Sequence, residues 1–296
     1  LGMARTYFGT DAAAAARAEI AAALRLRAHL PPRDALYAQA WDATFGPVGP
    51  MLSRWRLLGQ LYPDYFAAGT NYAQFAGEYR NDYRAALAAM GPATSDKNPY
   101  RGIAHYLRGA THAALEQFPQ ARRDFRTANA LGVTGTGQVQ ASAAAAERRY
   151  DDAAAILARA RGFGVASGDL DRWLVEIALP VDRGDWATAF AASDRARAAA
   201  APLGGVHART QAGIALALAS VARPGPGEAR ALRDFADDEA RALADKRDPE
   251  RPHAAFAVLA AGYLGARSGQ RDVLDQALAA QDEARALGYP LVDNLA

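Results

Sequence analysis

The sequence contains no cysteine. This absence excludes disulfides, thiolate metal sites and a cysteine nucleophile. Lysine occurs only at Lys97 and Lys246, so arginine carries almost all of the positive charge. The 34 basic and 32 acidic residues nearly cancel, and the arginines alternate with Asp and Glu. Nucleic-acid-binding proteins usually gather their basic residues on one stripe, so we expect no nucleic-acid partner.

Long apolar runs and strand patterns are also missing. No uninterrupted apolar run approaches the roughly 18 residues of a membrane span, so we expect no direct membrane insertion of this segment. No alternating run of Val, Ile and Thr is long enough to predict a strand. The start, Leu1 to Met3, has no initiator methionine and no basic-then-apolar signal pattern. We therefore expect a piece of a longer protein, with another domain before Leu1.

What the sequence does contain favours helices throughout. Alanine, the best helix former, is the commonest residue. Breakers such as Gly91-Pro92 and Asn98-Pro99 recur at short intervals. They leave segments of about three to five helical turns between them. The spacing predicts an all-α protein made of antiparallel helix pairs stacked in order.

A repeat of small and bulky residues supports this prediction. The tetratricopeptide pattern has a period of about 34 residues and places small side chains where two paired helices touch. In the clearest unit, Gly109 takes the small position of the first helix and Phe118 begins the second, with Ala121 and Phe125 on one face. In six units the two positions are 12 residues apart. The expected second-helix positions are Met51, Ala85, Ala121, Ala153, Ala189, Ala229 and Leu274.

Individual units differ in how well they fit the pattern. An aromatic residue stands at the second-helix start of several units, namely Tyr83, Phe118, Tyr150 and Trp186. The last unit pairs Gly262 with Leu274, followed by Leu278. A further unit, Gly213 with Ala229, needs about one extra helical turn near Pro224. The four tryptophans, Trp41, Trp55, Trp173 and Trp186, are expected in the core.

The first 30 residues stand apart from the repeats. Thr10 or Asp11 can cap a helix that runs to Leu30 and is ended by Pro31-Pro32. Residues 1–31 are therefore expected to be a capping helix or a truncated repeat. Residues 32–296 are expected to form about seven helix pairs in a right-handed superhelical solenoid.

On these motifs the chain resembles a tetratricopeptide-repeat protein over roughly residues 32 to 290. The segment Leu30 to Ala40, leading to Leu61-Tyr62-Pro63-Asp64, is similar to the opening of repeat regions in bacterial signalling proteins. Those proteins carry a kinase, a nucleotide cyclase or a winged-helix regulator in front of the repeats. The resemblance implies a sensory or scaffolding role. It leaves the effector, the oligomeric state and the compartment, bacterial cytoplasm or periplasm, open.

The resemblance also implies where a ligand would bind. First helices line the concave surface of such arrays, and one face of each first helix supplies the contacts. In this chain that face is expected to include Gln74, Gly77 and Ala110. The ligand-binding residues expected on that face are Thr70, Gln74, Ile103, Tyr106, Gln138, Ser142, Asp171, Leu174 and Tyr263. This apolar and lightly polar set suits an extended or helical apolar peptide or protein segment. Packing of the same residues against neighbouring helices is the alternative.

No pattern of catalysis or cofactor binding emerges. His105 and His112 are seven residues apart and share a helix face, but no HExxH and no nearby carboxylate in sequence completes a zinc site. The glycine-rich run Gly132 to Gly137 follows a helix and lacks the Lys-Ser/Thr of a phosphate loop. We therefore expect no catalytic residue, metal or cofactor. The main hypothesis is a peptide-binding scaffold or sensory module. A small-molecule sensor and a helical enzyme with an unrecognised site remain alternatives.

Overall fold

A computed structural model describes residues 13–160, 170–200, 225–246 and 251–287. These residues form fifteen α-helices and two short 3-10 helices, and no strand occurs within the described ranges. The predicted all-α class is confirmed.

The helices follow one another with short connections. Their bounds are α2 Ala13–Arg25, η1 Arg27–His29, α3 Pro32–Ala43, α4 Val48–Leu61, α5 Phe66–Arg80, α6 Tyr83–Met90, η2 Pro92–Thr94, α7 Arg101–Ala114, α8 Phe118–Ala130, α9 Gly137–Ala146, α10 Tyr150–Arg159, α11 Leu170–Asp182, α12 Trp186–Ala200, α14 Pro226–Ala244, α15 Arg251–Arg267, α16 Arg271–Ala279 and α17 Gln281–Ala286.

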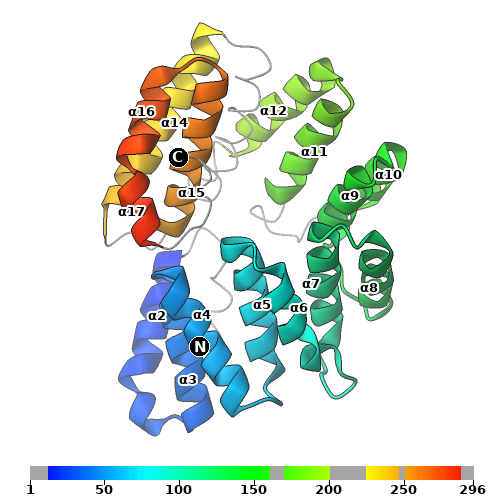
Figure 1. Cartoon of the computed structure of the whole chain (residues 1–296), viewed down its shortest axis with the longest axis vertical. Coiled ribbons are helices and arrows are strands. Elements are labelled where there is room, and N and C mark those ends of the chain that lie inside the picture. The colour runs from blue at the N-terminus through cyan, green and yellow to red at the C-terminus, as the bar shows by residue number, and fades with distance from the viewer. Residues whose placement is uncertain (1–12, 161–169, 201–224, 247–250, 288–296) are drawn as a thin grey trace. The chain divides into compact units, whose positions relative to one another are not determined.

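Neighbouring helices pack as pairs, as the sequence predicted (Figure 1). The pairs are α3/α4, α5/α6, α7/α8, α9/α10, α11/α12 and α15/α16, and α14 also packs on α15. The described parts of residues 23–163 form one compact unit, and those of residues 1–22 and 164–296 form another. Gly213, expected in a further pair, lies outside the described residues.

Five of these pairs are joined by the same kind of turn. A residue with left-handed backbone stands two positions before the second helix, where the first helix has just ended. These residues are Asn81 (φ 50°), Glu116 (φ 58°), Arg148 (φ 59°), Gly184 (φ 74°) and Gly269 (φ 77°). In four of the turns the next amide donates to the carbonyl five residues back, as in a Schellman motif; one example is Gln117 to His112 at 2.8 Å. The turn that connects the two helices therefore contains a left-handed residue at the same position in all five pairs.

The aromatic residues expected at second-helix starts stand where they were predicted. Helices α6, α8, α10 and α12 begin at Tyr83, Phe118, Tyr150 and Trp186. Trp41 and Trp55 are buried, and Trp173 packs partly buried against Ile177. The prediction that all four tryptophans lie in the core is wrong for Trp186, which is 46% exposed because it opens the first turn of α12 beside the turn that ends α11.

Small residues let paired helices approach closely. A Cβ atom at Gly109 would lie 2.8 Å from the Phe125 ring and 3.3 Å from the Ala121 carbonyl oxygen, which confirms this pairing. The pairing of Gly262 with Leu274 is wrong. Gly262 faces Ala277, whose Cβ atom would lie 2.2 Å from an added Cβ, because the register of α16 on α15 brings Ala277 and not Leu274 to the crossing.

The first described helix is shorter than the sequence indicated. Helix α2 ends at Arg25, and a 3-10 turn follows before Leu30 adopts extended backbone ahead of Pro31. The expected helix through Leu30 therefore stops at Arg25. The restriction on a residue before proline accounts for the extended backbone of Leu30. The expected caps, Thr10 and Asp11, lie outside the described residues.

Candidate functional site

A cavity of about 410 Å³ opens between α4, α5, α6 and η2. Its volume falls in the range of small-molecule sites, roughly 300–1,000 Å³. The wall is mainly apolar and aromatic. The residues that line it are Trp55, Arg56, Gly59, Gln60, Pro63, Tyr65, Phe66, Ala68, Gly69, Tyr72, Ala85, Ala88, Ala89, Pro92 and Ala93.

One wall of this cavity belongs to a rigid aromatic core. Trp55 of α4 is fully buried and makes edge-to-face contacts with Tyr37 and Trp41 of α3, at ring-centroid distances of 5.7 and 5.5 Å. The Phe75 ring of α5 lies 6.2 Å from Trp55 on another side. Edge-to-face aromatic pairs stabilise beyond the area that they bury, so this wall is held in one arrangement.

Short side chains on the opposite wall leave the space open. Ala85, Ala88 and Ala89 project from α6, which is drawn tightly against α5. A Cβ atom at Gly69 would lie 2.6 Å from the Ala89 carbonyl oxygen. The two backbones thus touch at Gly69, while alanines instead of larger residues border the cavity.

Arg56 is the one charged side chain among the residues that line this cavity. Its Nη2 atom donates a hydrogen bond of 2.7 Å to the Tyr72 hydroxyl, and its guanidinium lies 5.3 Å from the Tyr72 ring centroid. The hydrogen bond to Tyr72 is the main cause of the raised pKa of Arg56. A weaker attraction to Asp82 raises this pKa further. The cavity lining therefore includes one positive charge, on a side chain that is itself exposed to solvent.

A second, smaller cavity of about 250 Å³ lies between α5, α6 and α7. Three of its residues, Gln74, Gly77 and Ala110, lie on the first-helix face that the sequence assigned to ligand contacts. Two come from one helix pair and the third from the next. The residues that line it are Ala73, Gln74, Gly77, Glu78, Tyr83, Leu107, Ala110, Thr111 and Ala114.

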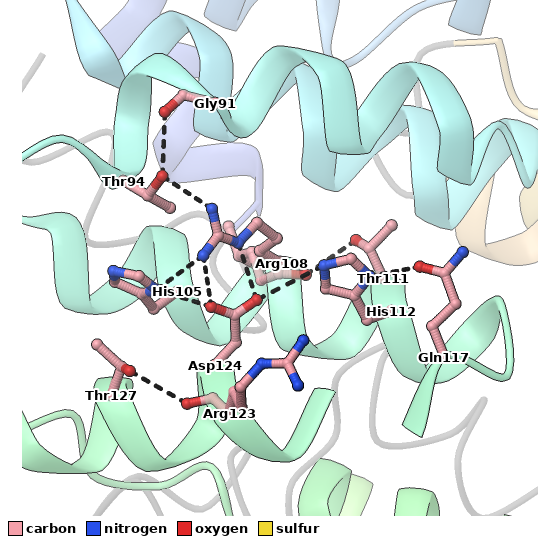
Figure 2. Close-up of polar contacts among 11 residues, drawn as sticks. Gly91, Thr94, His105, Arg108, Thr111, His112, Gln117, Arg123, Asp124 and Thr127 are labelled. Atoms are coloured by element: carbon pink, nitrogen blue, oxygen red, sulfur yellow. Dashed lines mark hydrogen bonds and ion pairs between the residues drawn. The ribbon is translucent and has the colours of Figure 1, made fainter. Parts of the chain in front are cut away.

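A buried carboxylate, Asp124 of α8, ties α7 to α8 (Figure 2). It accepts hydrogen bonds of 2.8 and 2.7 Å from Nε and Nη2 of Arg108, and it lies 2.8 Å from Nδ1 of His105. His112 lies 3.7 Å from the same carboxylate, with its Nδ1 atom 2.7 Å from the Gln117 side-chain oxygen. Burial acts to raise the pKa of Asp124, but Arg108 and His105 outweigh it and hold the pKa below its usual value.

The Asp124 contacts reach beyond the α7/α8 pair. Nη1 of Arg108 donates a 3.0 Å hydrogen bond to the Thr94 hydroxyl, which donates in turn to the Gly91 carbonyl oxygen (Figure 2). Thr94 ends η2, the turn that supplies Pro92 and Ala93 to the larger cavity. The chain of contacts from Asp124 thus positions part of that cavity's border.

The sequence alone did not reveal that a carboxylate lies beside the two histidines. Asp124 is 19 residues from His105 and sits on the next helix, so only the pairing of α7 with α8 brings them together. Even so, no group of three or more His, Cys, Asp or Glu in the described part of the chain has the arrangement of a metal site. Asp124 is engaged by Arg108 and by the His105 ring, which suits a structural tie.

The nine residues predicted to bind a ligand are dispersed. None lines the larger cavity, and Gln74 lines the smaller one, where its amide donates to Glu78 at 3.1 Å. Ile103, Ser142 and Tyr263 are exposed, Gln138 is buried, and Thr70, Tyr106 and Leu174 are half-buried. Tyr106 packs near the Phe125 ring, and the Asp171 side chain lies outside the described atoms.

Comparisons with known proteins do not assign the chain to a family. No model of a known protein family matches the chain, and no curated protein matches it either. Among the described helices, none has both the length and the apolar character needed to cross a bilayer.

Proposed function

We propose that the chain is a tetratricopeptide-like repeat scaffold, a right-handed superhelix of helix pairs, that binds a peptide or protein segment on its concave first-helix face. In this proposal it serves a bacterial signalling or maturation system and catalyses no reaction itself. The repeated left-handed turn inside five pairs supports the repeat architecture. A stack of similar pairs offers a continuous surface for an extended partner.

The smaller cavity is the observation that supports peptide binding. Gln74 and Gly77 from one pair and Ala110 from the next border it together, and all three lie at positions that face a ligand in this kind of array. Its wall combines apolar side chains with the Gln74 amide and the Glu78 carboxylate. An apolar side chain of a partner would fill the cavity, and the polar groups would orient the backbone beside it.

A peptide-library selection against the chain tests this proposal. Ala114 is exposed and lines the cavity, so Ala114→Glu should abolish binding of the selected peptides by placing a charge against an apolar side chain. Ala130 is an exposed alanine of α8 that does not line the cavity, and Ala130→Glu is the matched control. Peptides that bind both variants equally well would contradict the proposed site.

A small-molecule sensor is the second candidate function. The larger cavity favours it, because about 410 Å³ bordered by aromatic rings on a rigid core is typical of a ligand pocket. The two candidate functions rest on two cavities that share no lining residue, so each function can be tested without the other.

A further inference from the structure

We propose that the cavity between α4, α5 and α6 binds a small apolar carboxylate, with its apolar body among the aromatic and alanine side chains and its carboxylate on Arg56. The inference rests on the second candidate function, the small-molecule sensor, and specifies its ligand class.

The size and wall of the cavity define the apolar body. About 410 Å³ lies at the lower end of the range of small-molecule sites, roughly 300–1,000 Å³, so the ligand should be small. Trp55, Phe66 and Tyr72 contribute ring surface, and Ala88 and Ala89 contribute methyl groups. Such a wall favours an aryl or branched alkyl group over a sugar or a nucleotide, whose many polar groups would find few partners.

The charge on the wall defines the polar end of the ligand. No carboxylate is among the fifteen described residues that line the cavity, and Arg56 is its one cation. A guanidinium has five N–H donors in a planar fork that matches a carboxylate, so the bond to Tyr72 leaves capacity for a ligand. Asp82, the nearby acid, accepts a 3.1 Å hydrogen bond from the Ala85 amide at the start of α6.

The position of Arg56 is fixed in advance by Tyr72. The hydroxyl accepts one hydrogen bond from Arg56, and the guanidinium carbon lies 5.3 Å from the ring centroid, within reach of a cation–π contact. An arginine held in this way loses less side-chain freedom when it pairs with an anion, which favours recognition of a carboxylate over a neutral group.

Calorimetric titration of the chain with 4-phenylbutyrate and with its neutral amide tests the proposal. We expect the acid to bind about tenfold more tightly than the amide, because only the acid offers Arg56 a partner of opposite charge. Arg56→Gln should remove this preference and leave amide binding unchanged. Arg54→Gln is the matched control, because Arg54 lies on the same helix and contacts Gln39 instead of the cavity.

The location is tested by filling the cavity. Ala88 is exposed and lines it, so Ala88→Trp should weaken both ligands at least tenfold, whereas Ala130→Trp should leave both unchanged. Equal binding of acid and amide to the unmodified chain would overturn the carboxylate proposal while keeping a small-molecule site. Binding of neither probe would overturn this inference together with the sensor function. The peptide-binding proposal would be untouched in both cases.

Discussion

Arg108 of α7 donates two hydrogen bonds to Asp124 of α8, from Nε at 2.8 Å and from Nη2 at 2.7 Å. The pair joins the two helices through a carboxylate whose side chain is only 7% exposed. A buried carboxylate without such partners would carry a large desolvation cost, so the ion pair and the fold of this helix pair depend on each other.

Removing the charge of Asp124 should therefore destabilise the chain. We expect Asp124→Asn to lower the free energy of unfolding by about 1–3 kcal/mol, because Arg108 and His105 lose a charged acceptor in a largely buried setting. Urea denaturation followed by circular dichroism measures the loss. Asp152→Asn is the control: its ion pair with Arg149 is exposed and should contribute less than about 1 kcal/mol. Equal losses in the two variants would contradict the assigned role.

The same carboxylate predicts a specific response to acid. The pKa of Asp124 is lowered in the folded chain, so its contribution is fully present above the unfolded value of about 3.9 and is lost as the pH falls through the lower folded value. The stability difference between the unmodified chain and Asp124→Asn should thus shrink below about pH 4. Denaturation midpoints of both proteins across acidic pH check this. A difference that is constant with pH would refute it.

The close crossing of α15 and α16 predicts that one glycine cannot be replaced. Alanine normally stabilises a helix interior by about 1 kcal/mol over glycine. At Gly262 the added Cβ would lie 2.2 Å from that of Ala277, so Gly262→Ala should lower the melting temperature. Gly49 of α4 has open space around its added Cβ, so Gly49→Ala should be neutral or stabilising. Thermal unfolding of the two variants gives the comparison, and a stable Gly262→Ala protein would disprove the packing.

The left-handed turns predict two stabilising substitutions. Glu116 and Arg148 adopt φ values of 58° and 59°, a conformation that costs a non-glycine residue roughly 1–2 kcal/mol. Glu116→Gly and Arg148→Gly relieve this strain but make the unfolded chain more flexible, so a net gain of about 0.5–1 kcal/mol is expected. Gly184→Ala, at the equivalent turn with φ 74°, should be destabilising. Chemical denaturation measures all three, and a loss at both Glu116 and Arg148 would argue against these turns.

The helices and their pairing could be predicted from the sequence because their signals are local. Tyr83, Phe118 and Tyr150 each open a second helix, and proline and glycine mark the connections. Helix propensity and breakers act within a few residues, so they can be read without knowing the fold. The left-handed turns at Glu116 and Arg148 escaped notice, because neither residue is the glycine that normally marks such a turn.

The cavities and the buried ion pair depended on contacts between helices. The cavity beside Arg56 forms because Trp55 of α4, Gly69 of α5 and Ala88 of α6 meet in space, although no motif links them in the chain. Asp124 was likewise undetectable beside His105, since a one-helix view offers no carboxylate there. Which residues line the cavity and which contact Asp124 depends on the register of one helix on the next. The Gly262 pairing shows that this register is easily misjudged in alanine-rich segments.

The hydrogen bond from Arg108 to the Thr94 hydroxyl bears on the order in which the helices unfold. The connector between α6 and α7 is fastened at Thr94, and the Asn98 side chain also donates 2.6 Å to the Ala93 carbonyl oxygen within it. Melting of the α7/α8 pair would release this connector and, with it, the end of α6. In stacked helix pairs cooperativity passes between nearest neighbours, so these two pairs should exchange their amide hydrogens with solvent as one block.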